Sequence, residues 1–255
     1  MKKAWIIARR DFRSYFASPI AYLIIAFFLA VVGWMFFNGL AYYIRENAMY
    51  NANQVGARGA TITDGIVRPL YGNMNVIFLL LLPLLTMRVF SEEKKQHTIE
   101  LLLTSPVKLS HLVIGKFLSS ALFVGVMLAC TLVYPIILAI AGNPDYGPIF
   151  TSMLGTFLLA CWYLSLGGMF SAMTENQIVA AALTFLTGLF FWLIPWASQA
   201  AGPMWGEVLN YLSPINHFNN FTRGLLDTAD VAYYLSATGV NLFITHRILD
   251  SYRWR

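Results

Sequence analysis

Long uncharged apolar stretches alternate with short polar segments along the chain. Each stretch is near the ~20 residues that an α-helix needs to cross the ~30 Å hydrocarbon core of a bilayer. The pattern therefore predicts an all-α, polytopic membrane protein, with six transmembrane helices in one membrane domain over residues 1–255. The predicted spans are 19–40, 73–88, 112–140, 148–173, 178–195 and 231–246. The intervening residues 41–72 are predicted to form a polar loop.

Residues 1–18 have the pattern of an amphipathic helix instead of a span. At 100° per residue, an apolar arc that contains Trp5, Phe12 and Phe16 lies apart from a basic arc. Such a helix lies in the headgroup plane of a membrane, with its apolar side toward the acyl chains. The basic side chains expected at the membrane surface are Lys2, Lys3, Arg9, Arg10 and Arg13.

Residues 196–230 fit neither a span nor a solvated loop. They are semi-apolar but contain Pro203, Pro214 and Asp230, so they are too polar to cross a bilayer. Backbone of this kind is tolerated at membrane depth only where protein or a cavity satisfies its polar groups. We therefore expect a re-entrant or interface-lying helical hairpin on the outer side, between spans 5 and 6.

Composition agrees with a chain whose surface faces lipid. The chain is 58% hydrophobic and 11% charged, whereas a soluble domain carries about 25% charged residues. The net charge of +5 would suit a nucleic-acid partner. However, the basic residues fall at the edges of apolar stretches, where lipid headgroups would meet them, so membrane lipids and no nucleic acid are expected as partners.

The distribution of the 17 Lys and Arg residues predicts the orientation. In the six-span arrangement thirteen of them lie on the side of the N-terminus and four on the other side. Positive charge is enriched in cytoplasmic loops. We therefore expect a multi-pass protein of the bacterial inner (cytoplasmic) membrane with both termini in the cytoplasm.

The spans offer little titratable chemistry. Proton and ion pathways use ionisable groups inside the membrane, and Lys116 lies close enough to the start of its span for its stem to reach the interface. The sequence also contains no phosphate-binding loop, so we expect no cofactor or metal on this chain and no catalysis by it alone. Two alternatives remain, an ion-coupled carrier or channel and a membrane-embedded enzyme. For an enzyme, the available polar cluster is His217 with Asn216, Asn219 and Asn220, which fits helix caps and packing better.

The segment between spans 2 and 3 is the most charged part of the chain. A short amphipathic helix is predicted over 91–104, with Ser91 as its N-cap, Glu92 and Glu93 in its first turn and Pro106 after its end. It is either a solvated loop or a docking helix for a soluble motor domain on the cytoplasmic side.

The motifs of this segment resemble those of ABC-2 type transporter permeases. The resemblance rests on RVFSEEK from Arg88, Thr98-x-Glu100-Leu-Leu, Ser105-Pro106 and Gly115-Lys116. The stretches from Leu212 to Phe218 and from Phe221 to Asp227 are also similar to that family, and the subset associated with gliding motility matches best. Where the family has a glycine before the threonine, this chain has His97.

The resemblance implies a role for each matching stretch. Residues 91–104 would be the coupling helix that docks in the ATPase, residues 1–18 the interface helix and 196–230 the outer re-entrant region. The implied coupling residues are Arg88, Ser91, Glu92, Glu93, Thr98 and Glu100, and those of the outer region are Pro214, His217, Arg223 and Asp227.

The function expected from pattern and resemblance is that of the permease subunit of an ATP-binding-cassette exporter. A separate ABC ATPase subunit would bind ATP and Mg. Six spans rarely enclose a route for a large substrate, so a second permease chain is expected, in a homodimer or related heterodimer. The uncharged spans favour a lipid-like or amphipathic substrate.

Overall fold

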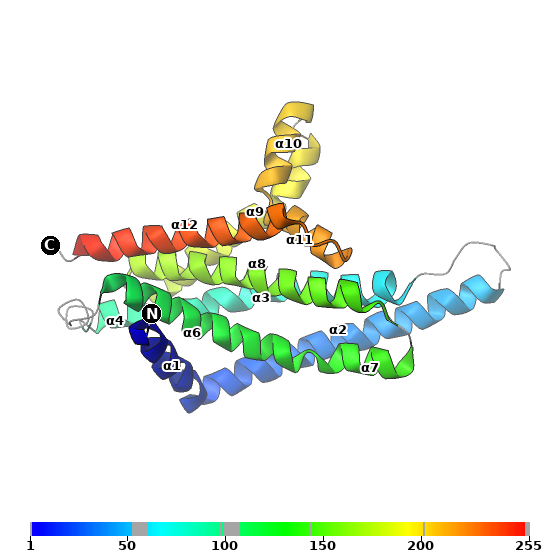
Figure 1. Ribbon diagram of the computed structural model, residues 1–255, viewed down its shortest axis with the longest axis horizontal. Coiled ribbons are helices and arrows are strands. Elements are labelled where there is room, and N and C mark those ends of the chain that lie inside the picture. The colour runs from blue at the N-terminus through cyan, green and yellow to red at the C-terminus, as the bar shows by residue number, and fades with distance from the viewer. Residues whose placement is uncertain are drawn as a thin grey trace.

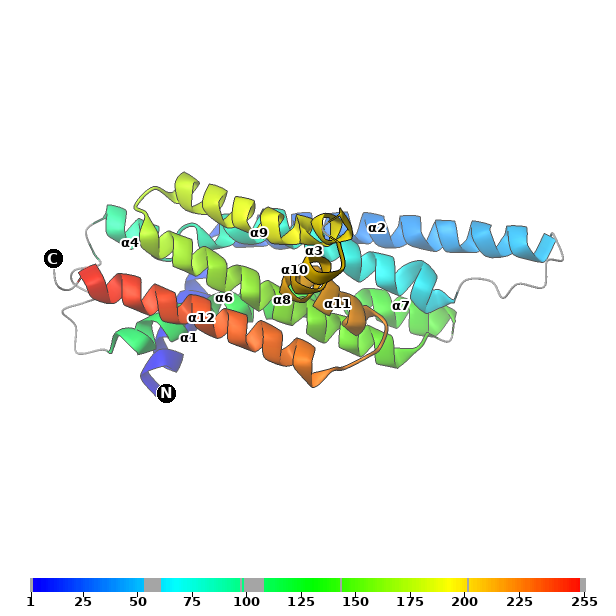
Figure 2. The same ribbon diagram turned by 90° about the horizontal axis from the view of Figure 1, so that it is seen from above.

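The computed structural model describes residues 2–52, 61–96, 98, 108–142, 144–200 and 202–252. The regular structure in these ranges is entirely helical, and most helices lie along one long axis (Figures 1 and 2). The helices are α1 (Lys2–Ala17), α2 (Pro19–Ala52), the π-helix η1 (Thr63–Val67), α3 (Arg68–Thr86), α4 (Ser91–Lys95), α6 (Leu109–Cys130), α7 (Val133–Ala141), α8 (Tyr146–Met173), α9 (Gln177–Ala200), α10 (Gly202–Leu212), α11 (Pro214–Thr222) and α12 (Thr228–Tyr252).

The two ends of this bundle differ. Both chain termini and α4 lie at one end, which we call the terminal end, and α2 reaches furthest toward the opposite end, the far end (Figure 1). The amphipathic α1 lies obliquely across the terminal end, as expected for residues 1–18. The all-α prediction is thereby confirmed for the described residues.

Most of the predicted spans lie in helices suited to a bilayer. Five described stretches are long and apolar enough to cross: Pro19–Met49, Thr63–Lys95, Leu109–Ile140, Tyr146–Met173 and Gln177–Ala200. They contain the first five predicted spans, which confirms a multi-pass architecture. The sixth predicted span lies in α12, which has 25 residues and would extend about 37 Å. Because α12 also carries Asp230, Arg247 and Asp250, its crossing stays a prediction.

The predicted loop over 41–72 was wrong at both of its described ends. α2 continues to Ala52, and helical structure resumes at Thr63. Residues 41–52 contain no Gly or Pro, and a polar composition alone does not end a helix. α3 also starts before the predicted residue 73, because Pro69 is suited to the first turn of a helix.

The core is built around α3 and α8, which expose the smallest share of their residues. Phe78 on α3 stacks on Phe28 of α2, with ring centroids 5.2 Å apart. Near the terminal end, the buried Thr86 of α3 faces Gly167 of α8, where a Cβ atom would overlap the threonine side chain. The close approach of these two helices therefore depends on a residue without a side chain.

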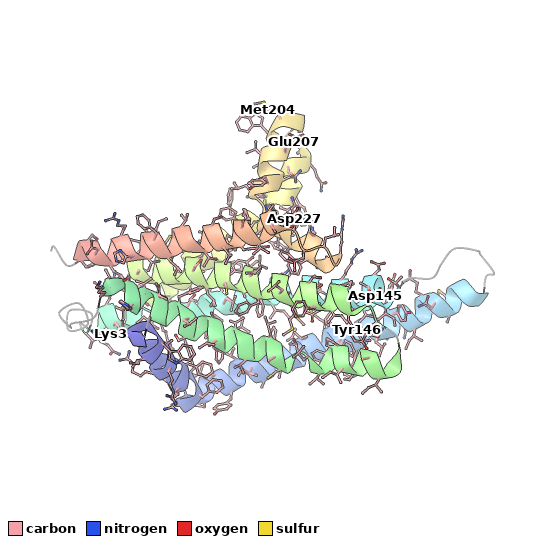
Figure 3. The ribbon with its side chains drawn as sticks, viewed as in Figure 1. Lys3, Asp145, Tyr146, Met204, Glu207 and Asp227 are labelled. Atoms are coloured by element: carbon pink, nitrogen blue, oxygen red, sulfur yellow. The ribbon has the colours of Figure 1, made fainter. Side chains whose placement is uncertain are left out.

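The region predicted to form an outer hairpin contains a projecting arm, and its re-entrant position on the outer side stays a prediction. α10 stands away from the bundle beside the end of α9 (Figure 1), and Ser198 Oγ and Asn210 Oδ1 are 2.7 Å apart across the two helices. Gly202 has φ +77°, a left-handed conformation that glycine adopts without strain, and it starts α10. Met204 and Glu207 lie on the part of the arm remote from the bundle (Figure 3).

We predict that Gly167→Ala destabilises the protein by about 1–3 kcal/mol, because the added methyl group overpacks against Thr86. Gly168→Ala is the matched control, since a Cβ there meets no atom within 4 Å. That change should be neutral or stabilise α8 by up to about 1 kcal/mol. The midpoint of thermal unfolding in detergent measures both, and equal midpoints would contradict this account of the α3–α8 contact.

Candidate functional site

The segment expected to couple to an ATPase lies at the terminal end. α3 ends at Thr86, and after a short turn α4 covers Ser91–Lys95. The predicted helix over 91–104 is thus confirmed over 91–95. Residues 97 and 99–107 lie outside the described residues, and with them the predicted site residue Glu100.

The N-terminus of α4 is held by a serine of another helix. Ser171 Oγ of α8 accepts the backbone N–H groups of Phe90 and Ser91, both at 3.0 Å, and donates to the Met87 carbonyl at 3.1 Å. The prediction of Ser91 as N-cap was wrong. Phe90 occupies that position, and the Ser91 hydroxyl donates to the Met87 carbonyl oxygen. No sequence signal points to Ser171, which lies eighty residues further along the chain.

The C-terminal half of α4 is held by a buried lysine. Lys94 Nζ donates to the Ala172 carbonyl oxygen near the end of α8 and lies 3.7 Å from the centroid of the Tyr252 ring on α12. The last carbonyl groups of a helix lack intrahelical partners and carry partial negative charge. Lys94 therefore satisfies a helix end and ties α4 to both α8 and α12.

A second lysine joins α4 to α6. Lys116 is buried, and its Nζ lies 2.7 Å from Glu93 Oε1 and donates to the Val89 carbonyl oxygen at 2.7 Å. Asp11 Oδ2 of α1 is 4.0 Å from the same nitrogen. The expectation that Lys116 reaches the membrane surface was wrong, because α1 and the α3–α4 turn cover it. We call Lys116 with Glu93, Val89 and Asp11 the Lys116 junction.

α1 packs on α6 beside this junction. A Cβ atom at Gly115 would lie 2.9 Å from the Ala4 carbonyl oxygen, so the close approach of α1 to α6 at this point requires a glycine. The Tyr15 hydroxyl lies 3.1 Å from Ser120 Oγ of α6. Burial is the main cause that raises the pKa of Tyr15, so the phenol stays uncharged at neutral pH.

The basic residues of α1 lie on its exposed side. Lys3, Arg9, Arg10 and Arg13 are exposed, and Arg10 Nε donates to Asp11 Oδ1 at 2.8 Å. The side chain of Lys2 lies outside the described residues. Their contact with a membrane surface stays a prediction.

The other predicted coupling residues lie close to the junction. Arg88 is exposed and Glu92 is half-buried, and together with Glu93 they line one cavity of about 590 Å³. Thr98 is anchored to the end of α4, where its backbone N–H donates to the Glu93 carbonyl oxygen at 3.0 Å. The structure thus gathers the described members of the predicted set around α4.

The predicted outer residues fall into two groups. Pro214 starts α11, and its carbonyl accepts the Tyr234 hydroxyl at 2.5 Å. His217 is buried, with Nδ1 at 2.6 Å from Asp230 Oδ1 and Nε2 at 2.8 Å from the Tyr211 carbonyl oxygen. Arg223 and Asp227 are exposed instead.

His217 joins α10, α11 and α12. Its ring stacks on Tyr233 with centroids 4.1 Å apart, and Asn220 donates to the second Asp230 oxygen at 2.9 Å. This agrees with the interpretation of the cluster as packing. Asp230 was not predicted as a member, and the signal for it was the lone acid at the start of the last apolar stretch. Among the residues that the structure describes, no three His, Cys, Asp or Glu side chains converge on a possible metal position.

Comparison with known protein families matches residues 5–247, nearly the whole chain, to a family described as ABC-2 family transporter protein. A comparison with curated proteins finds no match.

We predict that Lys116→Met costs about 3–5 kcal/mol of stability, because it leaves the Glu93 carboxylate and the Val89 carbonyl without their donor. Adding Glu93→Gln removes the stranded charge and should recover a large part of the loss. Glu92→Gln is the control, because Glu92 accepts only a 3.4 Å bond from Gln96 among the described residues, and should change stability by less than about 0.5 kcal/mol. Additive effects of Lys116→Met and Glu93→Gln on unfolding in detergent would show that the two side chains are not coupled.

Proposed function

The chain belongs to the ABC-2 family of transporters, and from this premise we propose that it is the permease of an exporter for a lipid-like or amphipathic substrate. Membership makes it a membrane transport subunit that is not an enzyme by itself, and it implies an ABC ATPase as partner. ATP and Mg would bind to that partner. The motifs from Arg88 to Lys116 are nearest to the subset associated with gliding motility.

The attachment of α4 to the bundle is the observation that carries the proposal. Three side chains fasten this short helix: Ser171 at its start, Lys94 at its end and Glu93 through Lys116. Ser171 and the Ala172 carbonyl bound by Lys94 belong to α8, Lys94 also contacts Tyr252 of α12, and Lys116 belongs to α6. A force applied to α4 would therefore reach three long helices at once, as a coupling helix requires.

The orientation proposed is that the terminal end faces the cytoplasm of a bacterial inner membrane. Most Lys and Arg residues lie toward that end under the six-span arrangement, and cytoplasmic segments are enriched in them. An ATPase in the cytoplasm could then reach α4 and the exposed side of α1. The arm of α10 projects sideways from the bundle, between the terminal end and the far end (Figures 1 and 2).

A second permease chain is part of the proposal. The most apolar part of α9 is less buried than that of any other candidate span. The arm also exposes Trp196, Met204 and Trp205. Within one chain, the arm projects without a covering layer of helices (Figures 1 and 2). A two-fold partner, identical or related, would cover these surfaces and complete a route between the two chains.

The orientation can be tested with single cysteines in a chain that lacks Cys130 and Cys161. We expect Asn219→Cys to react with a membrane-impermeant maleimide in intact cells, and Ser251→Cys to react only after permeabilisation. Both positions are exposed, so a difference between them reports the side of the membrane. Labelling of Ser251→Cys from outside would contradict the six-span arrangement.

The coupling role can be tested at Glu100, the acid of the Thr98-x-Glu100 motif. We predict that Glu100→Lys leaves expression and membrane insertion intact but weakens binding of the ATPase roughly 30-fold or more, because removing one partner of a buried interfacial charge pair costs about 2–5 kcal/mol. Co-purification of the complex and ATP-dependent transport are measured together. Glu207→Lys, an identical charge change on the outer arm, is the control. Retention of the ATPase and of unmodified transport by Glu100→Lys would refute the coupling role.

A further inference from the structure

The cavity beside the Lys116 junction has two unlike halves. It has a volume of about 590 Å³ and lies between α1, α2, α3, α4 and α6. Its charged and polar lining includes Asp11, Arg88, Glu92, Glu93, Gln96 and Lys116, and its apolar lining includes Ile20, Ala21, Ile24, Leu81, Leu84 and Leu85. Ile20 is 49% and Leu84 55% exposed, so the apolar half opens on the surface that would face the acyl chains.

The polar half contains groups that the protein leaves available. Lys116 is committed to Glu93 and to the Val89 carbonyl. Arg88, in contrast, has no hydrogen-bond or ion-pair partner among the described residues. Glu92 accepts one long bond from Gln96, at 3.4 Å, and the second Glu93 oxygen has no partner within the described part of the chain. The wall therefore offers an exposed guanidinium group beside the Glu92 carboxylate, which accepts only one long hydrogen bond.

These groups specify the ligand, and we propose that the cavity binds an amphiphile whose head carries a phosphate and a primary ammonium, as in phosphatidylethanolamine. The inference rests on the proposed function for the position of the terminal end in the membrane. A guanidinium group binds phosphate oxygens with two parallel N–H donors, which Arg88 can supply. The ammonium donates three hydrogen bonds, which suits the unsatisfied carboxylate oxygens of Glu92 and its neighbours.

The groups in the cavity wall also discriminate against the headgroups of other common lipids. A choline head has no N–H donor for the carboxylates, and a purely anionic head would meet the like charges of Asp11, Glu92 and Glu93. The acyl chains lie along the apolar half of the cavity. They cannot pass between α2 and α3 further than one turn beyond Ile24 and Leu81, because the Phe28–Phe78 stack closes the space between these helices.

The test is lipid binding by the purified full chain in detergent, followed by native mass spectrometry. The probes are didecanoyl phosphatidylethanolamine, the matched phosphatidylcholine and phosphatidylglycerol, and soluble phosphoethanolamine as a competitor. We expect phosphatidylethanolamine to bind best and Arg88→Gln to weaken its binding about tenfold, as for loss of a charge-assisted hydrogen bond. Glu92→Gln should reduce the preference over phosphatidylcholine. Arg45→Gln, at an exposed arginine of α2 outside the cavity, should leave binding unchanged.

Three results would contradict the proposed phosphatidylethanolamine site, and each can be told from the others. Equal binding of the three lipids, or unchanged binding by Arg88→Gln, would show that this cavity does not recognise the lipid headgroup. Competition by phosphoethanolamine at the same concentration as the lipid would show that the ligand is a soluble zwitterion. Binding is measured without the ATPase, so its failure is distinct from a failure of transport in the complex.

Discussion

Lys116 carries an ammonium group that is covered by two other segments of the chain, and the arrangement of the terminal end follows from how that charge is satisfied. An unpaired buried charge is too costly to retain, so the nitrogen requires acceptors within hydrogen-bond distance. Glu93 and the Val89 carbonyl supply them from the α3–α4 segment, and Asp11 adds negative charge from α1. The position of α4 and the packing of α1 on α6 therefore both contribute to satisfying one buried charge.

The rest of the fold connects this junction firmly to the long helices of the bundle. α3 and α8 form the best-covered part of the bundle, and α4 is fastened to α8 at both of its ends, through Ser171 and the Ala172 carbonyl. A short helix alone is marginal in water. α4 has 5 residues, so its helical state depends on these tertiary contacts. A movement of α4 would therefore be passed on to the helices that hold it.

The sequence predicted what depends on local pattern and missed what depends on distant partners. The first five spans and the amphipathic α1 follow from apolar runs and helical periodicity, both of which are readable within twenty residues. The helix boundaries were less accurate, because polar residues after Leu40 continue α2 without any breaker. Lys116 was assigned to the membrane surface, since nothing near it in the sequence indicates that Glu93 and α1 cover it.

The two proposals about the terminal end are linked through shared residues. Glu93 and Lys116 both hold α4 and line the cavity, so a ligand that draws on the carboxylates alters the contacts that position α4. If a docked ATPase favours one position of α4, it changes the affinity of the cavity for its ligand. By thermodynamic reciprocity, the ligand then changes the affinity for the ATPase by the same factor. If both proposals hold, the chain would need no long-range relay between ligand and ATPase at this end, because one buried ion pair would belong to both sites.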